Sequence, residues 1–175
     1  MTRGILLVLL VLALALGAGV GTAKVLDVLD EKQRVRQALR EAAVMMDLDA
    51  DILEAIGVVE SGLRLGAINR AGRDGEHGGA FGPTQITERT ARRNGYTGDM
   101  LAFTTDEKLA ALWTAKLLRP GAQNAEGHVL DHELWTPEEY GAWWNGGALS
   151  PSAVPATSSA IGYMKKLADA VELLA

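Results

Sequence analysis

One glutamate of this chain follows an apolar helical pattern and has the properties of an acid catalyst. Leu53, Ile56, Gly57 and Glu60 recur at helical intervals, so they share one side of a helix. Apolar surroundings remove water from a carboxyl group, disfavour its charged form and raise its pKa. Such a group is a general acid near neutral pH, the role of the acid in glycoside cleavage. Two other interpretations stay open here: the Glu60 side chain bends back to solvent, or it pairs with Arg64.

Helical patterns surround this glutamate on both sides. Apolar residues recur at helical intervals over residues 25–46, and the last helix is expected to hold Ile161, Met164, Ala168 and Val171 on one side. The residues expected to cap the remaining helices are Asp51 with Glu54, Thr87, Thr104 with Glu107, and Thr136 with Pro137 and Glu139. No segment alternates between apolar and polar residues as an exposed strand does. The sequence therefore predicts an all-α domain, with at most a short hairpin within residues 62–79.

Several short motifs occur in a fixed order along these helices. Glu60-Ser61 is followed by AIN at 67–69, GAFGPTQI at 79–86, WNGG at 144–147 and a tyrosine at position 163. Together they resemble the signature of soluble lytic transglycosylases, a family with the goose-type lysozyme fold. That signature consists of Glu-Ser, a loop, Gly-Leu-Met-Gln-Ile/Leu, an aromatic-Asn-Ala-Gly element and a tyrosine near the C-terminal end. The resemblance covers about residues 52–167.

The resemblance implies a peptidoglycan lytic transglycosylase of lysozyme-like, goose-type fold. Glu60 would protonate the glycosidic oxygen between N-acetylmuramic acid and N-acetylglucosamine. Its carboxylate would then accept the proton of the muramyl C6 hydroxyl, which closes on C1 and leaves a 1,6-anhydromuramyl end without using water. Because the N-acetyl group of the substrate stabilises the intermediate, one protein carboxylate is enough, unlike in most glycosidases.

The resemblance also assigns the residues of the substrate cleft. Ser61, Gln85, Asn145 and Tyr163 match family positions that line the cleft and orient the sugar or Glu60. Gly82, with Gly79, would let the backbone approach the substrate closely, because glycine has no side chain. Among the tryptophans, Trp144 is expected to face the cleft, and the others are expected in the core: Trp113, Trp135 and Trp143.

The segment between the two ends of the motif leaves the reaction type open. Pro83-Thr84 stands where the family has Leu-Met, which alters the apolar wall beside the scissile sugar. Asp74 or Glu76 would turn the enzyme into a hydrolase if its carboxylate held a water and lay about 6.5–9.5 Å from the Glu60 carboxyl. The alternatives to a transglycosylase are therefore a muramidase on the same fold and a non-catalytic wall-binding domain.

Composition restricts the partners and cofactors. The chain has 175 residues, enough for one helical domain and a short appendage, and no cysteine. Its formal charge of −5 argues against nucleic-acid binding, which needs a basic surface. His128 and His132 lie four residues apart, but no third ligand accompanies them, so we expect surface histidines, no metal and no cofactor. The expected partners are peptidoglycan glycan strands, and the expected state is a monomer.

The first 23 residues predict export. Arg3 precedes an uncharged segment, residues 4–23, that is rich in leucine at first and ends in Gly21-Thr22-Ala23. This pattern fits a signal peptide cleaved after Ala23, and it is also long enough for an uncleaved anchor in the inner membrane. The catalytic domain would then comprise residues 24–175 on the periplasmic or cell-wall side, tethered or released. A phage endolysin and a wall-opening enzyme of a secretion apparatus both fit this organisation.

Overall fold

A computed structural model describes residues 19–70, 79–134, 136–146, 152, 154 and 159–174. These residues are mostly helical and carry one small sheet, so the predicted all-α class is confirmed for them. Three subjects of the sequence predictions lie outside the described residues: most of the export segment, the loop acids Asp74 and Glu76, and Trp135.

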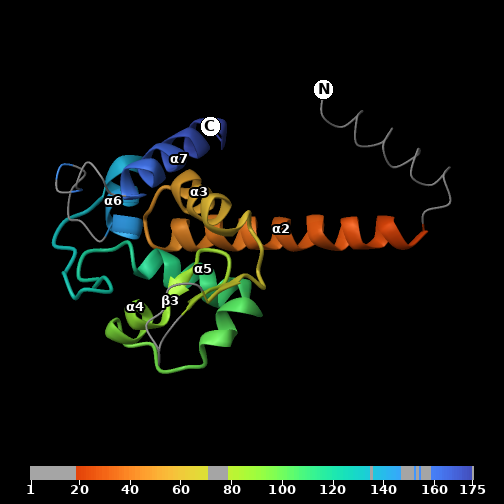
Figure 1. Cartoon of the computed structure of the whole chain (residues 1–175), viewed down its shortest axis with the longest axis horizontal. Helices are drawn as coiled ribbons and strands as arrows, with labels where there is room; N and C mark the ends of the chain where they lie inside the picture. Colours follow the sequence, from red (N-terminus) through yellow and green to blue (C-terminus); the bar gives the residue numbers. More distant parts are fainter. Residues whose placement is uncertain are drawn as a thin grey trace.

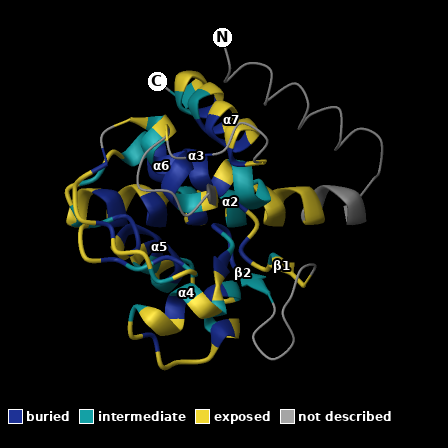
Figure 2. Ribbon diagram, turned by 60° about the vertical axis from the view of Figure 1, so that its left-hand side comes forward, coloured by how far each residue is buried: buried dark blue, intermediate teal, exposed yellow. Residues whose placement is uncertain are grey.

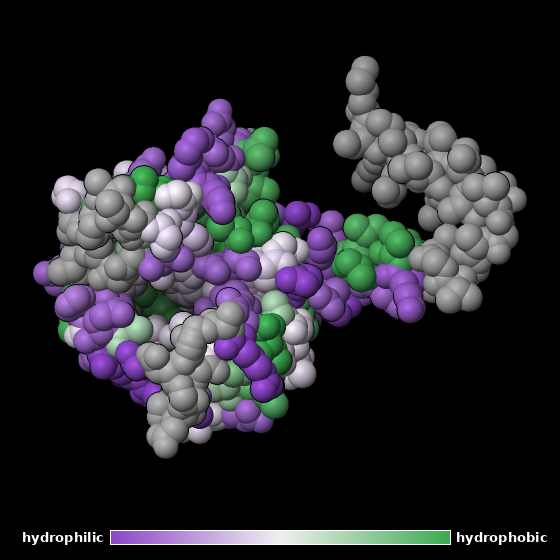
Figure 3. Space-filling model, viewed as in Figure 1, coloured by the Kyte–Doolittle hydropathy of each residue, from purple (hydrophilic) through white to green (hydrophobic). Residues whose placement is uncertain are grey.

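Helix α2 (Gly19–Met45) forms the axis of the domain (Figure 1). Its second half is covered on both sides, and Val35, Leu39 and Ala43 are buried there. Its first half projects beyond the body of the domain, so the apolar side chains Val25 and Val28 stay exposed on it (Figure 3). The helix continues without a break across the predicted boundary after Ala23. Among the described residues, none of the helices combines the length and the apolar character that a membrane span requires.

Two groups of elements lie on opposite sides of α2 (Figures 1 and 2). One group consists of helices α3 (Ala50–Ser61), α6 (Pro137–Gly146) and α7 (Ser159–Leu174). The other holds β1 (Ile68–Asn69), β2 (Ala80–Phe81), β3 (Ile86–Thr87), α4 (Glu88–Arg93), the 3-10 helix η2 (Met100–Thr104) and α5 (Glu107–Lys116). The strands pair antiparallel in the order β1-β2-β3, so the sheet extends past the hairpin region that the sequence predicted.

Each group has its own buried cluster facing α2 or the sheet (Figure 2). The α3, α6 and α7 side contributes Leu53, Ile56 and Trp143 to a core shared with α2. The sheet side is centred on Phe103, which stacks on Tyr96 with ring centroids 4.6 Å apart. Trp113, predicted in the core, is only partly buried and packs at the edge of this second cluster.

Helix starts follow the capping rules, though not always at the predicted residue. The Thr136–Glu139 box is confirmed, because each residue's side chain accepts the backbone N–H of the other. Thr87 caps α4, as predicted. The boxes predicted at Asp51–Glu54 and Thr104–Glu107 are wrong: the caps are Asp49 and Asp106.

Glu54 fails as a capping residue because tertiary structure uses its carboxylate elsewhere. The residue is 1% exposed, and its carboxylate accepts hydrogen bonds from Arg36 and Arg40 on α2.

The predicted inner face of the last helix, α7, is partly corrected. Met164 is buried as predicted, but the other buried residues are Ala160, Tyr163, Leu167 and Ala170, and Ile161 is 40% exposed. Most buried positions of α7 therefore lie one residue before the predicted ones, because α7 packs on both α3 and α6.

Candidate active site

Glu60 is the penultimate residue of α3, where the chain turns toward the sheet. The helix ends at Gly62, which adopts the left-handed conformation with φ of 67° and donates its N–H to helix carbonyls. Glu60 lines a cavity of about 290 Å³ between the two groups of elements. Asn69, Ala80, Gln85, Ile86, Thr87, Thr90, Leu117, Trp144 and Asn145 line the rest of it.

Burial raises the pKa of the Glu60 carboxyl above that of an ordinary glutamate. Loss of water raises the pKa of Glu60 to about 7, and this effect outweighs the hydrogen-bond donors Tyr163 and Trp144, which lower it. The Nε1–H of Trp144 donates to Glu60 Oε1 over 3.0 Å. The group therefore exchanges its proton near neutral pH, as a general acid and base must.

Tyr163 lies behind Glu60 with its hydroxyl buried. This hydroxyl is close enough to lower the pKa of Glu60, but it makes no hydrogen bond of regular geometry with any described residue. Burial and the neighbouring Glu60 raise the pKa of Tyr163 far above its ordinary value, so the hydroxyl keeps its proton. A buried donor without a fixed partner is costly, and this one is available to the neighbouring Glu60 carboxylate.

The two alternative interpretations of Glu60 are wrong. Its carboxyl is mostly buried instead of extending into solvent, and it forms no ion pair with a described residue. Arg64, the expected partner, donates its Nε to the carbonyl of Ser61 over 2.9 Å. Arg64 is exposed and does not line the cavity.

A tight turn at residues 82–85 forms the floor beneath Glu60. Gln85 has φ of 57°, an uncommon conformation for a residue with a side chain, and its Nε2 donates to the Gly82 carbonyl over 2.9 Å. Ser61 Oγ donates to the carbonyl of Pro83 over 2.8 Å, which joins the end of α3 to the turn. The motif thus fixes the position of the acid relative to the sheet.

The structure divides the predicted cleft residues into two sets. Gln85, Trp144 and Asn145 line the cavity with Glu60. Ser61, Gly82 and Tyr163 are not part of this lining. Ser61 bonds to the turn that carries Gln85, and the buried Tyr163 hydroxyl lies near Glu60. Gly82 allows a close approach of two backbone segments, because a side chain there would meet the backbone carbonyl of Phe103. The predicted approach of Gly82 to substrate stays a prediction.

Sequence reasoning missed part of the cavity. A second cavity of about 190 Å³ shares Thr87, Thr90, Leu117, Trp144 and Asn145 with the first one and continues it. It adds Gln123, Asn124 and Glu126 from the segment after α5. Asn124 is only 7% exposed, and its Oδ1 accepts the backbone N–H groups of the turn at 126–128. Turn-forming asparagines give no sign in a sequence that they border a groove.

Neither a group of metal ligands among the described residues nor a match to a known protein identifies this site. Among the described residues, no group of three or more His, Cys, Asp or Glu side chains converges as metal ligands do. His128 and His132 are both exposed, in agreement with the predicted surface position. Comparisons with protein-family models, with curated proteins and with solved structures find no match to this chain. The similarity of its motifs to lytic transglycosylases stays a prediction.

Replacement of Trp144 by Phe tests the hydrogen bond between α6 and Glu60 on α3. The change keeps an aromatic ring but removes the N–H donor that favours the Glu60 carboxylate, so the pKa of Glu60 should rise above 7. NMR titration of the Glu60 carboxyl carbon measures this directly. Trp113→Phe is the matched control, since Trp113 packs at the edge of the sheet-side cluster. A lower or unchanged pKa in Trp144→Phe contradicts the role given to the indole.

Proposed function

We propose that this chain is a peptidoglycan lytic transglycosylase with a lysozyme-like, goose-type arrangement of helices. The observation that carries the proposal is the desolvated carboxyl of Glu60, with a pKa of about 7, at the wall of a cavity. The order of the motifs around Glu60, Gln85, Asn145 and Tyr163 supports the same family.

The surroundings of Glu60 suit both halves of the proposed reaction. In the first half, protonated Glu60 gives its proton to the glycosidic oxygen, which desolvation favours because it keeps the acid neutral. The carboxylate that remains is stabilised by the Trp144 N–H and the nearby Tyr163 hydroxyl. In the second half, this carboxylate accepts the proton of the muramyl C6 hydroxyl as that oxygen closes on C1. Glu60 regains its proton, and no water is consumed.

The cavity and its continuation would hold the glycan strand. Amide side chains of Gln85, Asn145 and Gln123 offer donors and acceptors to sugar hydroxyl and N-acetyl groups, while Trp144 offers a ring. Export of the domain to the periplasmic or wall side, with or without a tether at residues 4–23, belongs to the same proposal. So does the setting as a phage endolysin or a wall-opening enzyme of a secretion apparatus.

Mass spectrometry of fragments released from purified peptidoglycan tests this function. We expect every new muramyl end to be a 1,6-anhydro end, which lacks one water compared with a reducing end. Reducing ends would assign a muramidase, because a water then attacks C1. Absence of release at neutral pH, with the protein folded, would leave a wall-binding domain. Digestion in H₂¹⁸O is the internal control, since only a hydrolase places the label in its product.

A further inference from the structure

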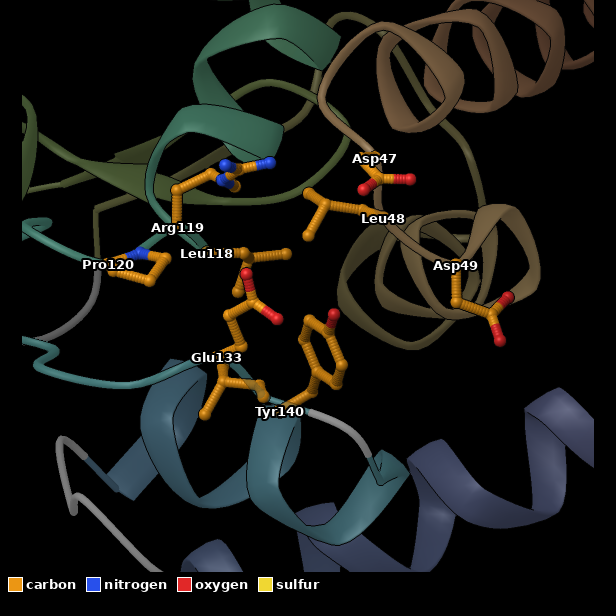
Figure 4. A pocket seen from close by; sticks show the side chains of 9 residues that line it. Asp47, Leu48, Asp49, Leu118, Arg119, Pro120, Glu133 and Tyr140 are labelled. Carbon is orange, nitrogen blue, oxygen red and sulfur yellow. The ribbon is translucent and has the colours of Figure 1, made fainter.

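A further cavity lies at the start of α3, beside its connection to α2 (Figure 4). It has a volume of about 340 Å³, and we call it the distal cavity. Its lining comes from the α2–α3 connection, the end of α5 and the start of α6: Asp47, Leu48, Asp49, Leu118, Arg119, Pro120, Glu133, Leu134 and Tyr140. Eleven residues of helix separate Asp49 from Glu60, roughly 16 Å at the rise of an α-helix, so the distal cavity is separate from the candidate active site.

The distal cavity contains a tyrosine hydroxyl, that of Tyr140, on an otherwise buried residue. Tyr140 is only 2% exposed, and its ring is part of the main core. Its hydroxyl points into the cavity (Figure 4) and forms no hydrogen bond with any described residue. Burial, followed by the charges of Asp49, Glu133 and Glu139, raises the pKa of Tyr140 to about 12. The hydroxyl therefore stays protonated and keeps its oxygen lone pairs for a ligand.

Carboxylates outnumber cations around this hydroxyl. Three acids line the cavity against one base, Arg119, whose guanidinium donates to the carbonyl of Met46. Asp49 is occupied as the cap of α3 and points away from the cavity. Asp47 and Glu133, in contrast, form no ion pair or side-chain hydrogen bond with any described residue. Two exposed carboxylates and one hydroxyl oxygen of the cavity therefore have no partner among the described residues.

We propose that the distal cavity binds an aliphatic primary ammonium group, held by Asp47, Glu133 and the hydroxyl of Tyr140. An ammonium group has three N–H donors and no acceptor, which matches these acceptors in number and sign. The methylene chain that carries it fits the apolar walls, Leu48, Leu118 and Leu134. A bare metal ion fits less well, since no three ligand side chains converge in the described part of the chain. An anion would be repelled, because carboxylates outnumber cations in the lining of the cavity.

Titration with Nα-acetyl-L-lysine, followed by the backbone amide signals of residues 47–49 and 133–140, tests the proposal. We expect saturable shifts that are confined to these residues. Nα,Nε-diacetyl-L-lysine has the same backbone but no ammonium group, and it should produce no saturable shift. Because the measurement is binding of a soluble amine, its result does not depend on lytic activity. Equal binding of the two compounds, or binding of neither, overturns the proposal.

Two variants locate the site. Glu133→Gln removes one charge-assisted hydrogen bond and should weaken binding of Nα-acetyl-L-lysine by about tenfold. Tyr140→Phe keeps the ring in the core and should also weaken it. Glu138→Gln is the matched control, because Glu138 is an exposed acid of the same helix start that does not line the cavity. Affinity that stays unchanged in both test variants, with native amide spectra, contradicts the proposed position of the ammonium group.

Two sources supply such an amine, and the same titration distinguishes them. The peptide L-alanyl-D-isoglutamyl-L-lysine represents the peptide stem of a cell wall, and 1,5-diaminopentane represents a free diamine. Tighter binding of the peptide assigns the distal cavity to wall peptides, and tighter binding of the diamine assigns it to free polyamines. If neither amine binds, the proposed ammonium site is wrong.

Discussion

Glu60→Gln is expected to stabilise the protein above neutral pH while abolishing its activity. The pKa of Glu60 is raised from 4.5 to about 7 in the folded state, so the folded state holds a proton that the unfolded state loses between these values. The free energy of unfolding of the wild type therefore falls as pH rises through this window. Glutamine stays neutral throughout. The gain from the substitution should be about 3 kcal/mol larger near pH 8 than near pH 4.

Thermal unfolding of both proteins across this pH range measures the effect. At high pH, a gain of this size raises the melting temperature by roughly 5–10 °C for a domain of this length. Glu172→Gln on α7 is the control, because that carboxylate is exposed and no pH-dependent gain is expected there. If Glu60→Gln gives the same change in stability near pH 4 and pH 8, the pKa of Glu60 is not raised.

The same substitution removes the proposed acid. Wall cleavage by Glu60→Gln should fall by roughly 10²–10⁴-fold, the usual contribution of a general acid or base. In the wild type, activity should decline as pH rises through about 7, because the glycosidic oxygen needs the protonated carboxyl. A variant that is more stable and inactive indicates that Glu60 is kept for chemistry at the expense of stability. Retained cleavage would exclude both the transglycosylase and the muramidase centred on this residue.

Gly82→Ala is expected to be the most destabilising small substitution in the candidate active site. Gly82 has φ of 78°, a conformation that costs an L-residue with a side chain about 1–2 kcal/mol. Its added Cβ would also lie well inside van der Waals contact with the Phe103 carbonyl, which is backbone and cannot rotate away. Together these effects should cost about 3 kcal/mol or more. Cleavage should fall too, because Gln85 and the Pro83 carbonyl belong to the same turn.

Substitutions at two other glycines distinguish the cost of the positive φ from the cost of the contact with the Phe103 carbonyl. Gly95 has φ of 87°, but no atom lies within 4 Å of a Cβ built there, so Gly95→Ala reports conformational strain alone. Gly66 has open space and no positive φ, so Gly66→Ala should be close to neutral. Urea unfolding of the three variants should rank Gly82→Ala well above Gly95→Ala and both above Gly66→Ala. Equal losses for Gly82 and Gly95 would mean that the Phe103 contact relaxes freely.

Local rules in the sequence determined the helices and the position of the acid. Periodicity placed Leu53, Ile56 and Glu60 on one face, and the structure has the first two at 0% exposure with Glu60 beside them. The Thr136–Glu139 box was also predictable, because both partners lie within one turn. An interaction of this range depends on neighbouring residues, so it forms as predicted where no distant segment binds the same side chains.

Only the tertiary structure determined which acid caps α3, which acid binds arginine and which acid is desolvated. Asp51-Ile-Leu-Glu54 has the spacing of a cap, yet two arginines of α2 bind Glu54, and Asp49 caps the helix instead. The partner of Glu60 lies 84 residues away, at Trp144, and not at the nearby Arg64. Desolvation of Glu60 and the free hydroxyl of Tyr140 likewise arise from packing of segments that are distant in the chain. Burial depends on what covers a residue, and local periodicity indicates only which side is available to be covered.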